Sequence, residues 1–332
     1  MLLIIKKYFL LLILIVIILL NIVPTDYYLL APGEAIDLSE KILVENGGKD
    51  ANGKILLTSV TMLKANLGQF LYGIFDPGVD LVKEKERLFS EFSYEEYLDI
   101  SSRMMEESQL ISKIIALRKA GYNPEITGHG ILVTKVDEHS PANNQLTPGD
   151  VIVKINNESV STIEEFSDYL QKLSVGQNIK VTFLRNNSLF STSIPIVDLS
   201  KYGENVEKKM GIGIYASTKD LECKFPLKIE INLTGIKGSS ASLMIALEIL
   251  NQLTENDLSN GLIIAGTGNL GIDGKISKVE GIKQKIISAI KKNADVFIVP
   301  KDNYEEAMKY SQRIKVIPIE CFDELIIQLL RL

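Results

Sequence analysis

The fold is decided by residues 225–253, FPLKIEINLTGIKGSSASLMIALEILNQL. Apolar residues alternate from Leu227 to Leu233, which is typical of a half-buried strand, and from Leu243 onward they recur at helical spacing. Between the two patterns lies a loop of small residues. Free amide groups and the positive end of the helix dipole point outward at such a helix start. The segment therefore predicts a strand, a tight loop and a helix whose first turn suits an oxyanion.

A serine in this loop is either a helix cap or a nucleophile. Serine is among the preferred capping residues, and the loop holds three of them. A nucleophilic serine needs a base, and the two histidines, His129 and His139, lie far upstream, which argues against a Ser-His-Asp triad. The remaining common base is a lysine that burial keeps neutral. The residues alone leave capping and catalysis both open.

Two motifs resemble those of a known family. The run GIKGSSASLM at residues 235–244 and the run GIKQKIISA at residues 281–289 resemble the serine and lysine motifs of Lon-type proteases. The specific resemblance is to the membrane-anchored, PDZ-containing branch that lacks an ATPase domain. It implies a catalytic dyad of Ser240 and Lys285, with an oxyanion held by amide groups around Gly238 and Ala241. It also implies a homo-oligomer, usually a hexameric ring.

The serine motif departs from the family pattern at two positions. Ser239 stands where the family usually has proline, and Ser242 stands where it usually has glycine. These departures leave the nucleophile in place and bear on the geometry of its loop. They motivate an alternative function, a catalytically silent PDZ receptor on the same scaffold.

The choice of lysine rests on the family motif. On an ideal helix Lys283 falls inside the apolar arc and Lys285 at its edge, so helical phasing slightly favours Lys283. The motif selects Lys285. The stretch at residues 262–268 predicts an apolar strand, and Thr267, in the loop after a core strand, is a candidate to hydrogen-bond this lysine and orient it.

Composition limits the other chemistry. The chain has 332 residues, a net charge of −6 and two cysteines, Cys223 and Cys321, and it contains neither a CxxC nor an HExxH motif. We expect no metal, no cofactor and no nucleic-acid partner. The stretch GIDGK at residues 271–275 lacks the spacing of a phosphate-binding loop, so we expect no nucleotide chemistry. Asp273 and Gly274 in this stretch predict a hairpin turn.

The N-terminus predicts a membrane anchor. Lys6 and Lys7 precede an uncharged apolar run at residues 8–23, and no small-residue cleavage site follows it. We therefore expect residues 1–24 to form an uncleaved transmembrane helix rather than a signal peptide. The positive-inside rule then leaves the N-terminus in the cytoplasm and the rest of the chain outside the cell membrane.

Residues 121–198 resemble a PDZ domain. Gly128, Gly130 and Ile131 resemble its carboxylate-binding loop and the strand after it, and LTPGD at residues 146–150 resembles its characteristic turn. Residues 162–173 then form the groove helix, with a capping box of Thr162 and Glu165. A PDZ domain binds an extended peptide by strand addition.

Together these patterns predict a multidomain α/β (α+β) protein. Its parts are an anchor at residues 1–24, a supporting α+β region at 25–120, the PDZ domain at 121–198 and a Lon-type proteolytic domain at 205–332. The helix expected after residue 93 begins with a weak capping box of Ser93 and Glu96. The expected function is ATP-independent cleavage of extended peptides or partly unfolded exported proteins, captured by the PDZ domain.

Overall fold

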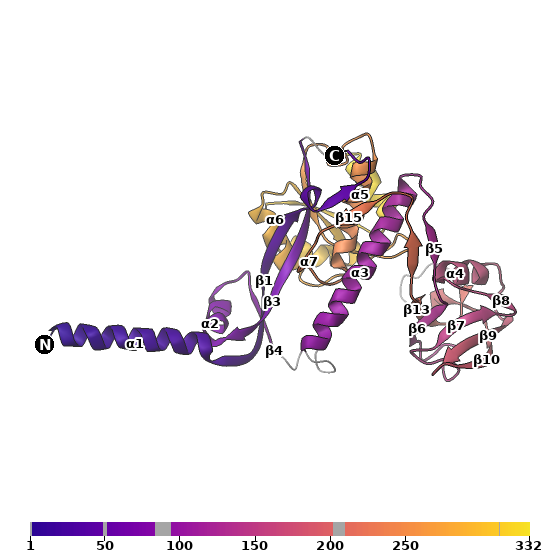
Figure 1. The fold of residues 1–332 in the computed structure, drawn as a ribbon, viewed down its shortest axis with the longest axis horizontal. Helices are drawn as coiled ribbons and strands as arrows, with labels where there is room; N and C mark the ends of the chain where they lie inside the picture. Colours follow the sequence, from indigo (N-terminus) through magenta and orange to yellow (C-terminus); the bar gives the residue numbers. More distant parts are fainter. Residues whose placement is uncertain (1, 49–51, 84–93, 202–209, 312) are drawn as a thin grey trace. The chain divides into compact units, whose positions relative to one another are not determined.

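The computed structural model describes residues 2–48, 52–83, 94–201, 210–311 and 313–332 (Figure 1). The chain divides into two compact units. One consists of residues 1–123 and 226–332, and we call it the catalytic unit; the other consists of residues 124–225, and we call it the PDZ unit. The serine and lysine motifs both lie in the catalytic unit. Cys223 and Cys321 do not form a disulfide in this structure.

The catalytic unit takes elements from both ends of the sequence. Before the PDZ unit come α1 (Leu2–Ile22), β1 (Pro24–Asp37), β2 (Ile42–Val44), β3 (Lys54–Asn66), α2 (Leu67–Phe75), β4 (Asp80–Lys83) and α3 (Tyr94–Lys119). After it come β15 (Ile229–Ile231), the 3-10 helix η5 (Ser239–Ala241), α5 (Ser242–Leu253), β16 (Ile263–Gly266), β17 (Asn269–Leu270), β18 (Ile276–Ser277), α6 (Ile282–Lys291), β19 (Val296–Pro300), α7 (Tyr304–Met308), β20 (Lys315–Ile319) and α8 (Phe322–Leu329).

A six-stranded sheet in the order β20-β19-β16-β3-β1-β4 forms the centre of this unit. The strands β20, β19, β16 and β3 run parallel to one another, whereas β1 is antiparallel to both of its neighbours, β3 and β4. Residues 25–66, expected in a supporting region, thus supply two strands to the sheet that also carries β16. The strand expected from Leu227 to Leu233 is shorter, and β15 pairs with β2 outside this sheet.

The helices α5 and α6 cover opposite faces of the central sheet. Ala265 of β16 packs in one apolar cluster with Ile282 and Ile286 of α6. Successive residues of a strand point to opposite faces. The next residue, Gly266, faces α5, because a Cβ there would lie 2.7 Å from Sδ of Met244. A glycine at this point therefore permits the close approach of α5 to the sheet.

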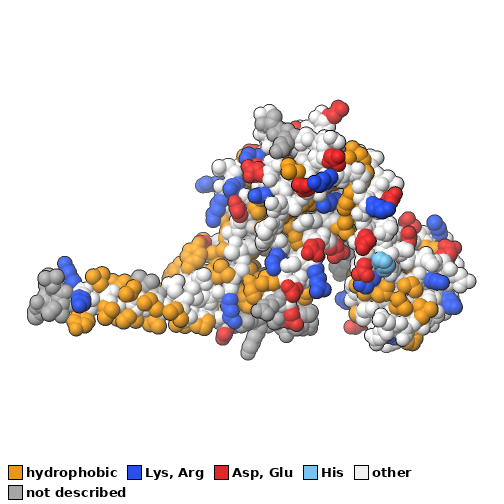
Figure 2. All heavy atoms as spheres, in the orientation of Figure 1, with side chains coloured by type: hydrophobic (Ala, Val, Ile, Leu, Met, Phe, Trp, Pro, Cys, Tyr) orange, Lys and Arg blue, Asp and Glu red, His pale blue; other side chains and the backbone are white. Residues whose placement is uncertain are grey.

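The N-terminal segment corrects the predicted membrane anchor. It forms α1, whose described side chains are almost all exposed (Figure 2). Within the described ranges, no helix has the length and apolar character that crossing a membrane demands. The physical reason is that Lys6 and Lys7 interrupt the apolar sequence, and the helix beyond them is about 22 Å long, shorter than a hydrocarbon core of about 30 Å. The predictions of a transmembrane helix and of a single-pass membrane location, with the catalytic part outside, were therefore wrong.

The PDZ unit is built on one antiparallel sheet, ordered β10-β9-β7-β6-β13, with β8 paired to β7. Its elements are β5 (Glu125–Thr127), β6 (Ile131–Val136), β7 (Val151–Ile155), β8 (Glu158–Ser159), α4 (Ile163–Gln171), β9 (Asn178–Arg185), β10 (Ser188–Pro195), β11 (Val197–Asp198), β12 (Met210–Gly211), β13 (Ile214–Thr218) and β14 (Glu222–Lys224). The predicted capping box of α4 is confirmed, since the Thr162 hydroxyl accepts from the Glu165 amide and the Glu165 carboxylate caps in return.

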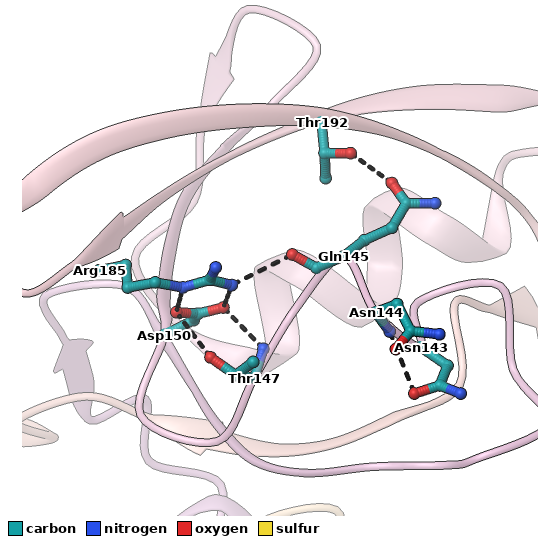
Figure 3. Close-up of polar contacts among 7 residues, drawn as sticks. All are labelled: Asn143, Asn144, Gln145, Thr147, Asp150, Arg185 and Thr192. Atoms are coloured by element: carbon teal, nitrogen blue, oxygen red, sulfur yellow. Dashed lines mark hydrogen bonds and ion pairs between the residues drawn. The ribbon is translucent and has the colours of Figure 1, made fainter.

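An ion pair in the core of the PDZ unit explains the LTPGD turn. Arg185 donates through Nε and Nη2 to the two carboxylate oxygens of Asp150, each at 2.7 Å (Figure 3). Burial alone would raise the pKa of the Asp150 carboxyl, but hydrogen bonds from Arg185 and Thr147 hold this pKa below its ordinary value. The buried aspartate thereby ties the turn to β9.

Other local predictions have mixed outcomes. The hairpin at Asp273 and Gly274 is confirmed, because β17 pairs antiparallel with β18 and Gly274 has a φ of 79°. The helix expected after residue 93 is one continuous helix, α3. Its predicted cap, Ser93, lies outside the described residues.

Candidate active site

The serine loop begins at Gly235 and ends where α5 begins. Gly238, with a φ of 91°, leads into the one-turn helix η5, and α5 follows without a break. Nearly every residue of α5 is buried, including Ser242 at its start, so the helix is fixed within the core. Ser240 itself is only partly buried. The loop therefore presents a reachable hydroxyl on a rigid support.

The lysine that meets this hydroxyl is Lys285. Its Nζ lies 2.9 Å from Ser240 Oγ and 2.9 Å from Thr267 Oγ1. The neighbouring Lys283 points elsewhere, because its Nζ pairs with the Asp80 carboxylate of β4 at 2.7 Å. Helical phasing had slightly favoured Lys283. The structure shows that the edge of the apolar arc, where Lys285 sits, is the side that faces the serine loop.

Thr267 connects the two residues. Its hydroxyl donates to the carbonyl oxygen of Ser240 at 3.0 Å and accepts from Lys285 Nζ. The backbone amide of Gly268 donates to the same Ser240 carbonyl at 3.0 Å. Thr267 is fully buried, so no water competes for these bonds. The loop after β16 thus holds both the serine backbone and the lysine side chain.

Burial changes the acidity of the lysine. Lys285 is 4% exposed. Desolvation lowers the pKa of its ammonium from 10.5 to about 8, and the charge of Glu280 opposes this effect. A substantial fraction of Lys285 is therefore neutral near pH 8, with a lone pair that can accept a proton.

The amide of Gly238 has a partner within its own unit. It donates to the carbonyl oxygen of Ser101 in α3 at 2.8 Å, and the expected role of Gly238 in holding an oxyanion stays a prediction. The first amides of a helix have no acceptor within that helix. In η5 these are the amides of Ser239 and Ser240, next to the nucleophile. The expected role of Ala241, at the end of η5, stays a prediction.

Ser242 has a structural part that the sequence did not reveal. Its side chain is fully buried; its hydroxyl donates to the Ser239 carbonyl at 2.9 Å and accepts from the Leu270 amide at 2.8 Å. Ser242, which departs from the family pattern, therefore connects the serine loop to β17. In the sequence, the only indication of this role was the position of Ser242 in the first turn of the predicted helix.

A cavity of about 530 Å³ lies beside the segment that leads into the serine loop. It is lined by β1 residues such as Asp37, by Leu233 before the loop and Ile236 within it, and by lysines including Lys54 and Lys292. Its lining contains acidic and basic residues but neither Ser240 nor Lys285. The cavity is therefore separate from the contact between Ser240 and Lys285.

The PDZ unit corrects the predicted peptide-binding residues. Ile131 begins β6, and β6 is paired with β7 on one side and with β13 on the other, so it has no free edge. The amide of His129 donates to the Lys219 carbonyl, and the amide of Gly130 donates to the Ser161 carbonyl. In the loop from Gly128 to Gly130, these two amides are therefore used in hydrogen bonds within the PDZ unit.

A free edge lies on β13 instead. Among the strands that the structure describes, β10 and β13 are the two end strands of this sheet, and β13 is the end strand next to β6. The groove helix α4 is tied to this end of the sheet, since the Ile163 amide donates to Thr218 Oγ1 and Gln171 Nε2 donates to the Met210 carbonyl. The sequence GIGI at residues 211–214 repeats the glycine pattern of residues 128–131 immediately before β13, and it is the signal that could have located this strand.

Comparisons with known proteins match different parts of the chain. A family model described as PDZ domain matches residues 78–196, and one described as Subunit ChlI of Mg-chelatase matches residues 196–303. An Archaeal Lon protease of Archaeoglobus fulgidus is 30% identical over 95 residues, and one of Halobacterium salinarum is 29% identical over 113 residues. These matches cover 28% and 33% of this chain, and 15% of each relative.

A solved structure adds a similar match. The PDZ domain of an SdrC-like protein from Listeria monocytogenes is 26% identical, covers 28% of this chain and 92% of that structure, and has a TM-score of 0.25. The chain spans about 15% of the length of the curated relatives it matches first. It contains a PDZ domain and a region homologous to Lon proteases.

Proposed function

We propose that this chain is a serine endopeptidase that uses Ser240 as its nucleophile and Lys285 as its general base, and that cleaves without ATP. The observation that carries the proposal is the 2.9 Å contact between Lys285 Nζ and Ser240 Oγ. The lysine is buried and its pKa is lowered to about 8. Homology to Lon proteases supports a protease.

The hydrogen bonds around Lys285 favour proton transfer in one direction. Thr267 gives its only hydroxyl proton to the Ser240 carbonyl, so toward Lys285 it can only accept. A neutral amine has two N–H bonds and one lone pair. One N–H satisfies Thr267, and the lone pair is then free to face the hydroxyl of Ser240. This arrangement prepares Lys285 to take the serine proton.

The reaction follows in two steps. Lys285 accepts the proton of Ser240 as Oγ attacks the peptide carbonyl, and the amides of Ser239 and Ser240 stabilise the oxyanion that forms. The lysine ammonium then gives the proton to the leaving amine, which leaves an acyl-enzyme on Ser240. Water, deprotonated by neutral Lys285, hydrolyses this ester and restores the free hydroxyl.

The proposal that cleavage needs no ATP rests on the sequence. The GIDGK stretch does not meet the pattern of a phosphate-binding loop, and its Asp273 and Gly274 belong to the β17-β18 hairpin. We infer that substrates are extended peptides or proteins that are already partly unfolded.

The PDZ unit would supply substrate to the dyad. The free edge of β13 supports strand addition by an extended peptide, and a PDZ domain typically holds a terminal carboxylate beside such a strand. Capture of one end of a chain raises the local concentration of its other segments. Amidation of the C-terminus of an unstructured substrate should then raise KM several-fold and leave kcat unchanged. Equal KM values for the acid and amide forms would refute capture through the terminus.

The test of the protease proposal compares three proteins. The wild type, Ser240→Ala and the matched control Ser239→Ala are incubated with an unstructured protein, with and without ATP. We expect equal cleavage by the wild type with and without ATP, near-normal cleavage by Ser239→Ala, and none by Ser240→Ala. Cleavage that persists in Ser240→Ala would refute the assignment of the nucleophile.

The alternative is a silent PDZ receptor, which the replacement of the expected proline and glycine by Ser239 and Ser242 favours. In the structure, however, the Ser242 hydroxyl reinforces the loop through its bonds to Ser239 and Leu270. Peptide binding without any cleavage by the wild type, at pH values up to 9, would establish the receptor and exclude the protease.

A further inference from the structure

The helix α3 lies against the serine loop along one face. Ser101, Ser108 and Ser112 are spaced by seven and four residues, so they share that face. All three are buried. The helix packs along α5 (Figure 1). The sequence had placed this helix in a supporting region at residues 25–120.

Each of these serines contacts the serine loop or the start of α5. The Ser101 carbonyl accepts from the Gly238 amide at 2.8 Å. Ser108 Oγ donates to the Ser239 carbonyl at 3.3 Å, and Ser112 Oγ donates to the Ser242 carbonyl at 2.8 Å. The three contacts therefore fall before, within and after η5, which carries Ser240.

A hydroxyl inside a helix ordinarily bonds the carbonyl four residues back. Ser102 makes this local bond, since its Oγ donates to the Leu98 carbonyl at 2.7 Å, and within the described residues it makes no other side-chain hydrogen bond. The single hydroxyl proton of Ser112 lies within reach of two carbonyl oxygens, that of Ser108 in α3 at 2.6 Å and that of Ser242 in α5 at 2.8 Å. Alanine would favour the helix more than serine does. Beyond its local bond, the hydroxyl of Ser112 therefore also has a partner at the start of α5.

We propose that α3 is a positioning element for the nucleophile, with Ser112 as its principal positioning residue. By its hydrogen bond to the Ser242 carbonyl, Ser112 fixes the position of the first residue of α5. The Ser101 carbonyl accepts the Gly238 amide and so turns this amide away from the substrate. The result is that Ser240 Oγ stays within reach of Lys285. None of the α3 serines touches the reacting atoms. This inference rests on the proposed function.

The experiment compares Ser112→Ala with Ser102→Ala, a serine on the same helix that makes only the local bond. A short fluorogenic peptide is cleaved at several pH values, and rates are divided by the concentration of active sites titrated with a fluorophosphonate. Loss of one buried hydrogen bond to the loop should lower kcat about fivefold to tenfold in Ser112→Ala. We expect KM and the midpoint of the pH profile to stay unchanged, because Lys285 remains buried. Ser102→Ala should match the wild type.

A second readout does not depend on catalysis. Amide hydrogen exchange in residues 238–242 should be faster in Ser112→Ala than in Ser102→Ala, because the loop opens more often. Ser108→Ala, whose contact is longer, should give a smaller effect in both assays. Equal kcat per titrated site and equal exchange in Ser112→Ala and Ser102→Ala would overturn the inference. Failure of the wild type to cleave would refute the proposed function instead, and the exchange data would still decide the role of α3.

Discussion

Replacement of Lys285 by methionine should make the protein more stable at neutral pH and less stable at alkaline pH. The ammonium of Lys285 is buried, and its pKa falls from 10.5 to about 8 on folding. Below pH 8 the lysine is charged in both the folded and the unfolded chain, so folding bears the full cost of desolvation. Between pH 8 and 10.5 the unfolded chain binds more protons, and stability rises with pH. Above pH 10.5 the lysine is neutral in both states, so folding no longer bears the desolvation cost of its ammonium.

The magnitude follows from the two pKa values. At 1.36 kcal/mol per pH unit, the cost is about 3 kcal/mol at pH 7 and about 1 kcal/mol at pH 10. Methionine removes this cost but also removes the bonds of Lys285 to Ser240 and Thr267, which contribute about 2 kcal/mol together. Lys285→Met should therefore gain about 1 kcal/mol at pH 7 and lose about 1 kcal/mol at pH 10.

The assay is urea unfolding of the full chain at pH 7, 8, 9 and 10, followed by a probe in the catalytic unit. The control is Lys283→Met, which breaks an ion pair with Asp80 and should lose about 1 kcal/mol at pH 7. All other ionisable groups are common to wild type and variant, so their titration cancels. A difference between Lys285→Met and wild type that stays constant from pH 7 to pH 10 would refute the lowered pKa.

Three further predictions concern activity and the loop. In the wild type, kcat/KM should rise about tenfold from pH 7 to pH 9, because the neutral fraction of Lys285 rises from about a tenth to about nine tenths; a midpoint near 10.5 in the measured profile would exclude a buried base. Lys283→Met should keep near-normal kcat in a peptide assay, since its ammonium pairs with Asp80, and loss of activity would point to Lys283 as the base. Ser242→Gly should lower the unfolding free energy by about 2 kcal/mol in urea, because it leaves the Leu270 amide without its acceptor; a gain would contradict the role of this hydroxyl.

Local patterns predicted the parts of the site that depend on neighbouring residues in the chain. The apolar run after residue 242 forms α5, and the segment of the lysine motif, treated as a helix, forms α6. Both predictions rest on periodicity, which reports how one helix buries its own face. The family motif selected Lys285, and this lysine lies beside Ser240.

The remaining features depend on contacts between distant segments. Asp80 draws Lys283 away from the serine loop, and these residues are 203 positions apart. The α3 serines meet the loop across about 130 positions. Spacing within one segment carries no information about such pairs. The pairing of β13 with β6 likewise moved the free strand edge away from the glycine loop that had been expected to bind peptide.

The central claim is that Ser240 is a nucleophile activated by Lys285, and covalent labelling tests it most directly. A fluorophosphonate probe is incubated with the full chain at pH 9 without ATP, and the modified residue is located by mass spectrometry. The account predicts one adduct on Ser240 in the wild type and labelling slower by at least about a hundredfold in Lys285→Ala, which keeps the serine but lacks the base. No adduct on Ser240, or equal labelling rates in wild type and Lys285→Ala, would contradict it.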